Sequence, residues 1–170
     1  KQSQVDAKHC TQSQYLKTLE NTRHQYNGYN LLFGNVKALQ VYNNVNNSTH
    51  PIDTGVYGLS NADIATPWPK VTQGVTALND YVAKKNSIID DDLFDILRCD
   101  NKANDAQLPD TGIGYEWEKA LSSIFIQTEK YGTRTSTLLL VDKNNTISWK
   151  ERRFSDKGEV LETRAFSFSI

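Results

Sequence analysis

Hydrophobic residues along the chain switch between strand-like and helix-like periods, and this pattern predicts the elements of the first third. A short helix is expected over 14–23, followed by strands at 29–33 and 38–44. The two strands form a hairpin with its loop near Gly34 and Asn35. A third strand is predicted over 55–62, after a polar loop rich in Asn, and it ends on small and polar residues.

The middle of the chain has helical periodicity. One apolar stripe recurs at spacings of four, three and four: Val71, Val75, Leu78 and Val82. Pro69 is compatible with the start of this helix. A second helix is expected over 91–98, where the acidic run 90–92 suits the positive end of the helix dipole better than it suits a metal site. A third helical segment is predicted around 121–125.

The last third is predicted to be strand: 136–142, a turn at 143–145, then 146–154 and 162–170. The run 137–141 is apolar or β-branched throughout, which is typical of a strand buried on both faces. Strands, then helices, then strands favour a mainly antiparallel α+β architecture. We expect one domain over 1–170, with a polar tail at 1–13.

Composition and charge argue against several classes of function. The 170 residues carry 19 Lys and Arg against 20 Asp and Glu, so neither a nucleic-acid nor a membrane-surface partner is expected. No apolar run approaches the roughly 20 residues of a membrane span. The two cysteines, Cys10 and Cys99, favour free thiols in a reducing compartment over a disulfide. The three histidines lie in polar segments, where surface placement is expected: His9, His24 and His50. The chain has no Met, even at position 1, and looks like part of a longer polypeptide.

Two stretches could carry chemistry. In the first, 58–61, a predicted strand ends by presenting Ser60 and Asn61. Asn61 is either a helix cap or Asx turn, or a donor aimed at developing negative charge, as an oxyanion hole requires.

The second stretch places Arg134 at the mouth of a predicted strand, between Thr133 and Thr135. Arg134 either forms an ion pair with a carboxylate such as Glu151, or binds a carboxylate or phosphate bidentately with the neighbouring hydroxyls. No nucleophile elbow, Gly-rich phosphate loop or metal triad accompanies these residues.

Six motifs occur in order: "YNGYNLL", "YGLSNA", "TPWPKV", "AQLPD", "YGTRTSTLLLVD" and the closing "ERRF…ETRAF". Over 15–168 the chain resembles the C-terminal two-thirds of the NRDE, or Transport and Golgi Organization 2, family. The resemblance implies an αββα fold like the N-terminal nucleophile hydrolases, incomplete at the N-terminus. The family's opening cysteine and Asn-Arg-Asp-Glu motif have no counterpart here, and Cys10 does not match the nucleophile.

The resemblance also implies a site. By motif position, Asn61 and Arg134 resemble the oxyanion-binding asparagine and the nucleophile-organising arginine of cysteine-nucleophile hydrolases. The same pocket would include Ser60, Thr133 and Thr135 as ligand-binding residues, with no metal.

The favoured function is intracellular trafficking or binding of a haem- or lipid-type metabolite, in the cytoplasm and without a resident cofactor. The alternative is a cysteine-dependent amide hydrolase or acyltransferase in a full-length chain, and a third is a structural scaffold. A small-molecule ligand and a homo-oligomer are the partners that the sequence allows, without a transmembrane segment.

Overall fold

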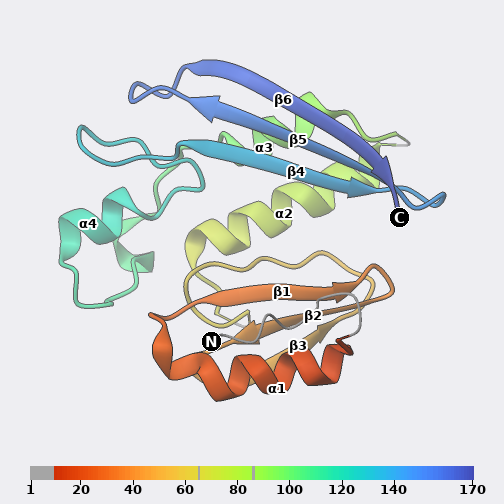
Figure 1. The fold of residues 1–170 in the computed structure, drawn as a ribbon. Coiled ribbons are helices and arrows are strands. Elements are labelled where there is room, and N and C mark those ends of the chain that lie inside the picture. The colour runs from red at the N-terminus through yellow and green to blue at the C-terminus, as the bar shows by residue number, and fades with distance from the viewer. Residues whose placement is uncertain (1–9, 65, 86) are drawn as a thin grey trace. The chain divides into compact units, whose positions relative to one another are not determined.

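The structure, a computed structural model, describes residues 10–64, 66–85 and 87–170. These residues form two compact units. The first comprises the described residues up to Gly55 and the segment that starts at Leu59, and the second comprises Val56–Gly58 and Thr66–Ile170. The two units contain one three-stranded antiparallel sheet each, together with helices (Figure 1). A mixed α and β architecture with antiparallel sheets is therefore confirmed, whereas the single domain stays a prediction.

The first unit is a helix followed by a three-stranded meander. Its elements are α1 (Gln12–Thr22), the 3₁₀ turn η1 (Arg23–Gln25), β1 (Asn30–Asn35), β2 (Ala38–Asn43) and β3 (Ser48–Ile52). Strand β2 lies between β1 and β3 and pairs antiparallel with both.

Helix α1 packs against one face of this sheet. Its start is fixed by a capping box, in which the Thr11 hydroxyl accepts from the Gln14 amide (3.2 Å) and the Gln14 side chain accepts from the Thr11 amide (2.8 Å). Tyr15 then packs edge-on against Phe33 of β1, with ring centroids 5.6 Å apart. Because side chains alternate along a strand, Asn30 of β1 lies on the opposite face of the sheet.

The second unit places helices before its sheet. Its elements are α2 (Pro69–Lys84), α3 (Asp90–Leu97), the 3₁₀ turn η2 (Asp105–Gln107), α4 (Tyr115–Ala120), β4 (Thr135–Val141), β5 (Thr146–Phe154) and β6 (Val160–Ser169). Strand β5 is central, with β4 and β6 antiparallel on either side. Among the described residues, no helix combines the length and apolar character needed to cross a membrane.

Helix α3 joins this sheet through aromatic and ionic contacts. Phe94 is buried, and the Arg152 guanidinium of β5 stacks 4.0 Å from its ring centroid. Lys150 and Arg152 form ion pairs with Asp90 and Asp91 at the helix start. The acidic run therefore both suits the helix dipole, as predicted, and fastens the helix to β5.

Two buried aromatic rings pack together in the second unit, and an arginine stacks on one of them. Phe125 and Phe154 are buried and meet edge-to-face at 4.9 Å. The guanidinium carbon of Arg98 lies 3.7 Å from the Phe125 centroid, and its Nη2 donates to the Gly158 carbonyl (2.7 Å). This cation–π contact ties the end of α3 to the turn between β5 and β6.

Two predicted elements and one predicted burial pattern are wrong. The segment 55–62 is not a strand, because β2 pairs instead with Ser48–Ile52 in the Asn-rich stretch. Pro51 is accommodated there because β3 is an edge strand, where a missing N–H does not interrupt a ladder. The segment 121–125 is not helical, because α4 ends at Ala120. The run 137–141 is not buried on both faces: Leu138 is 9% exposed but Leu139 is 54% exposed.

Candidate functional site

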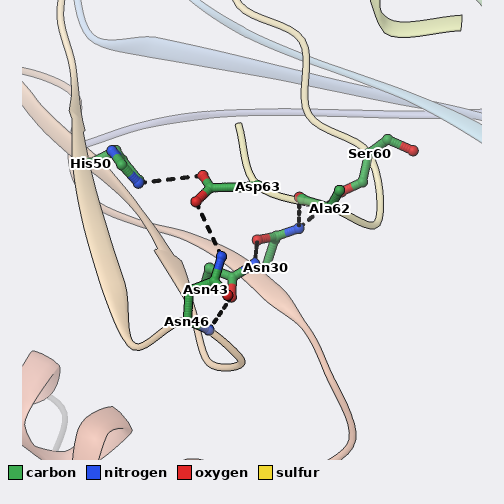
Figure 2. Close-up of polar contacts among 7 residues, drawn as sticks. All are labelled: Asn30, Asn43, Asn46, His50, Ser60, Ala62 and Asp63. Carbon is green, nitrogen blue, oxygen red and sulfur yellow. Dashed lines mark hydrogen bonds and ion pairs between the residues drawn. The ribbon is translucent and has the colours of Figure 1, made fainter. Parts of the chain in front are cut away.

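The loop that carries Ser60 and Asn61 is held onto the sheet of the first unit by one side chain. Asn30, at the start of β1, donates from Nδ2 to the carbonyl oxygens of Ser60 (2.9 Å) and Ala62 (2.9 Å) (Figure 2). Its Oδ1 accepts from Nδ2 of Asn43, the residue directly opposite on β2 (2.9 Å). The backbone on both sides of Asn61 is therefore fixed by the sheet.

A second set of contacts anchors the end of the same loop. Asp63 Oδ2 accepts from Asn46 Nδ2 (3.3 Å), and Asp63 Oδ1 lies 3.3 Å from His50 Nε2 of β3 (Figure 2). Asn46 is itself positioned by Asn43, whose Oδ1 accepts from the Asn46 amide (2.8 Å). The carboxamides thus connect the two anchors into one polar network, which we call the asparagine clamp: Asn30, Asn43, Asn46, His50 and Asp63.

Burial makes part of this network costly to disturb. Asn43 is 5% exposed, so its carboxamide depends on Asn30 and Asn46 to replace the hydrogen bonds it would make in water. The side chains of His50 and Asp63 are 40% and 26% exposed, and their contact becomes an ion pair when the imidazole is protonated. The two facing atoms, His50 Nε2 and Asp63 Oδ1, are themselves buried although the rest of each side chain is partly exposed.

Asn61 stands between the two fixed carbonyls with its own side chain exposed. Among the described residues, its carboxamide has no hydrogen-bond partner, and the N-cap of α2 is Trp68. The alternative of a helix cap or Asx turn is therefore not formed within the described part of the chain. The Asn61 backbone is therefore fixed, while its exposed carboxamide is accessible to solvent.

Arg134 lies in the second unit, immediately before β4. Its carbonyl accepts from the Phe154 amide (2.9 Å), while its side chain is exposed. The ion pair with Glu151 is absent from the described residues; instead Glu151 Oε2 accepts from the Thr137 hydroxyl (3.3 Å). The Arg134 guanidinium thus faces solvent on a backbone that β5 holds in place.

Thr133 and Thr135, the two threonines beside Arg134, differ in their contacts and exposure. Thr133 forms two hydrogen bonds with Ile126: its Oγ1 accepts from the Ile126 amide (2.9 Å) and its amide donates to the Ile126 carbonyl (2.8 Å). Thr135 opens β4 opposite Arg153 and is exposed. Thr133 therefore already serves the local fold, while Thr135 remains accessible. Asn61 and Arg134 belong to different units, so their convergence on one pocket stays a prediction.

The clamp itself was missed by sequence reasoning, which assigned His50 to the surface and gave the asparagines no role. The available signal was the pair of asparagines at the two open ends of the first hairpin, Asn30 and Asn43, which an antiparallel register places opposite each other. His9 lies outside the described residues. Within the described part of the chain, no group of three or more His, Cys, Asp or Glu side chains could hold a metal ion.

The fold defines a mixed α/β protein with two antiparallel sheets, and the asparagine clamp holds the loop of Asn61 on the first of them. The family model described as "Transport and Golgi organisation 2" matches residues 3–156. Relatives with this name include a mouse and a human protein, 31% and 32% identical over 92% of this chain, and a bovine protein, 32% identical over 81%. The chain therefore belongs to the Transport and Golgi organisation 2 family, which confirms the resemblance seen in the motifs. It spans 62% of the mouse and human relatives' length and 55% of the bovine one.

Proposed function

We propose that this chain is the ligand-binding part of a transport protein for a haem- or lipid-type metabolite. The observation that carries the proposal is the pair of hydrogen bonds from Asn30 to the Ser60 and Ala62 carbonyls. They fix the loop on which the Asn61 carboxamide is exposed, without a hydrogen-bond partner in the described part of the chain. Haem and lipids both end in carboxylate or ester oxygens, which are acceptors for such a donor. The relatives' printed name, with its reference to transport, agrees with this reading.

The remaining parts of the proposal concern the surroundings of Asn61. We infer that Arg134, with Thr135 and Thr133 beside it, supplies the cation that binds the anionic end of the ligand. The resemblance to the N-terminal nucleophile hydrolases is the basis for expecting an αββα fold in the longer protein. We also propose a cytoplasmic location. Its basis is separate from the binding site: the two free cysteines, Cys10 and Cys99, suit a reducing compartment.

The test is a binding titration with haem, followed by absorbance, and with a fluorescent long-chain fatty acid. Asn61→Ala should weaken binding of at least one probe about tenfold, because one hydrogen bond to a charged group contributes about 1.5 kcal/mol. Asn21→Ala is the matched control, since Asn21 is an exposed asparagine of the same unit on α1. Binding that is equally strong in both variants, or absent from the parent chain, would contradict the proposal.

A second candidate function is amide hydrolysis or acyl transfer by a longer chain that carries a cysteine nucleophile. The exposed Asn61 carboxamide favours it, because an oxyanion hole needs a donor that is fixed before the reaction begins. In such a chain Asn61→Ala should lower kcat roughly 100-fold for an amide substrate with little change in KM. An unchanged kcat, or no turnover by the longer chain, would rule this candidate out.

A further inference from the structure

Strand β6 is exposed along its whole length. Its ten residues pair only with β5 among the described residues, so β6 forms one edge of the sheet in the second unit (Figure 1). Every residue of β6 is exposed except Glu162, which is half-buried. A long edge strand with unpaired backbone groups is a template for another strand.

The face that β6 shares with β4 and β5 adds apolar surface to this edge. Two cross-strand rows of large apolar side chains lie there: Leu139–Trp149–Phe166 and Val141–Ile147–Phe168. Phe166 is 61% exposed and Phe168 is 50% exposed. The exposed area of these rows is on the order of 500 Å², as large as the biggest patch expected on a monomer.

We propose that β6 of a second copy of this chain pairs antiparallel with β6, in the register that places Thr163 opposite Thr163 of the partner subunit. This two-fold register joins the two sheets into one sheet of six strands. It places Glu162 opposite the partner's Arg164, and Arg164 opposite the partner's Glu162. The contact is isologous, so both ion pairs form at once.

Charge selects this register over its neighbours. Moving the two-fold axis by one residue places either Glu162 opposite the partner's Glu162 or Arg164 opposite the partner's Arg164, and like charges directly opposite are destabilising. Glu162 already pairs with Arg153 and with Arg164 Nε (3.0 Å) in its own chain, which holds the carboxylate on the correct face. In the dimer each Arg164 exchanges its own Glu162 for the partner's Glu162, while Arg153 keeps its contact with the carboxylate.

The start of β6 limits how far this register extends. The pairing of β5 with β6 shifts between Arg153 and Phe154, so β6 is irregular at Leu161 and the regular register centres on Glu162, Thr163 and Arg164. Val160 and Leu161, which are 56% and 59% exposed in the single chain, lie at the end of the paired segment, near the partner's Ala165 and the partner's Phe166. Pairing therefore satisfies edge N–H and C=O groups of β6 and brings these apolar side chains close to apolar side chains of the partner.

The register is tested by disulfide trapping. In a chain that carries Cys10→Ser and Cys99→Ser, Thr163→Cys should give a covalent dimer on mild oxidation. Residues directly opposite in antiparallel strands have Cα atoms about 4.5–5.5 Å apart, within the range that a disulfide can bridge. Ala165→Cys is the matched control, because its own copy would lie four residues away along the strand, about 13 Å. Equal trapping at both positions would overturn the register.

The charge pairing is tested by reversing the charge of one residue at a time in the 170-residue chain. Sedimentation should show a dimer at tens of micromolar for the parent chain. Arg164→Glu and Glu162→Arg should each raise the dimer Kd at least about tenfold, because each places like charges opposite in its own homodimer. An equimolar mixture of the two folded variants should dimerise again, since every opposed pair then has opposite signs. A parent chain that stays monomeric, or a mixture that does not associate, would overturn the proposal.

Discussion

Replacement of Asn30 by alanine tests whether one carboxamide holds the Asn61 loop to the sheet. The substitution removes three hydrogen bonds of 2.9 Å: two donated to the loop carbonyls of Ser60 and Ala62, and one accepted from Asn43. At about 1 kcal/mol each, their loss destabilises the first unit by about 3 kcal/mol. The bond from Asn43 contributes most to this loss. Asn43 is 5% exposed, so water poorly replaces the acceptor that its side-chain N–H loses.

The assay must report on the first unit. Tryptophan fluorescence does not, because Trp68, Trp117 and Trp149 all belong to the second unit. Native-state hydrogen exchange at the amides of the central strand, β2, measures the opening free energy of the sheet directly. A loss of 3 kcal/mol corresponds to roughly 100-fold faster exchange, since every 1.4 kcal/mol is a factor of ten.

A second variant separates the loop from the sheet. Asn30→Asp keeps an acceptor for Asn43 but places a carboxylate beside the Ser60 and Ala62 carbonyls, so it should release the loop at least as strongly as alanine does. Asn21→Ala, on α1, should leave the exchange of β2 within threefold of the parent. Exchange in Asn30→Ala that is also within threefold of the parent would refute the view that this clamp positions Asn61.

Two further changes probe the second unit. Lys119 hydrogen-bonds Asp105 and lowers the pKa of that carboxyl, so the stability it contributes is present above the ordinary aspartate pKa and is lost as pH falls through the folded pKa. In urea titrations, Asp105→Asn should therefore differ from the parent at neutral pH and converge with it in acid, and a constant difference would count against the contact. Gly58→Ala would place a methyl group 2.8 Å from side-chain atoms of Val71 and Val75, and should lower the unfolding free energy by about 1–3 kcal/mol in tryptophan-monitored urea titrations. An unchanged midpoint would show that this backbone segment is not packed on α2.

The local elements were predictable wherever a single period extends over several turns or residues. The stripe of α2 is an example: Val71, Val75 and Leu78 are half-buried, although Val82 at its end is 53% exposed. The hairpin of β4 and β5 was predicted closely, because the turn at 143–145 separates two strongly β-forming runs. In these segments the pattern of apolar side chains two, three or four positions apart is enough to predict the helix or strand.

The sequence by itself determined the family and the antiparallel character of the sheets, whereas the exposure of Asn61 and Arg134 was found only in the structure. Only the tertiary structure decided which segment becomes the third strand, because strand pairing depends on a partner elsewhere in the chain and not on local propensity. It also decided that Asn30 holds the loop thirty residues later, and that β6 has one strand neighbour among the described residues. These features arise from contacts between residues distant in sequence, and no period along the chain specifies which distant groups will meet.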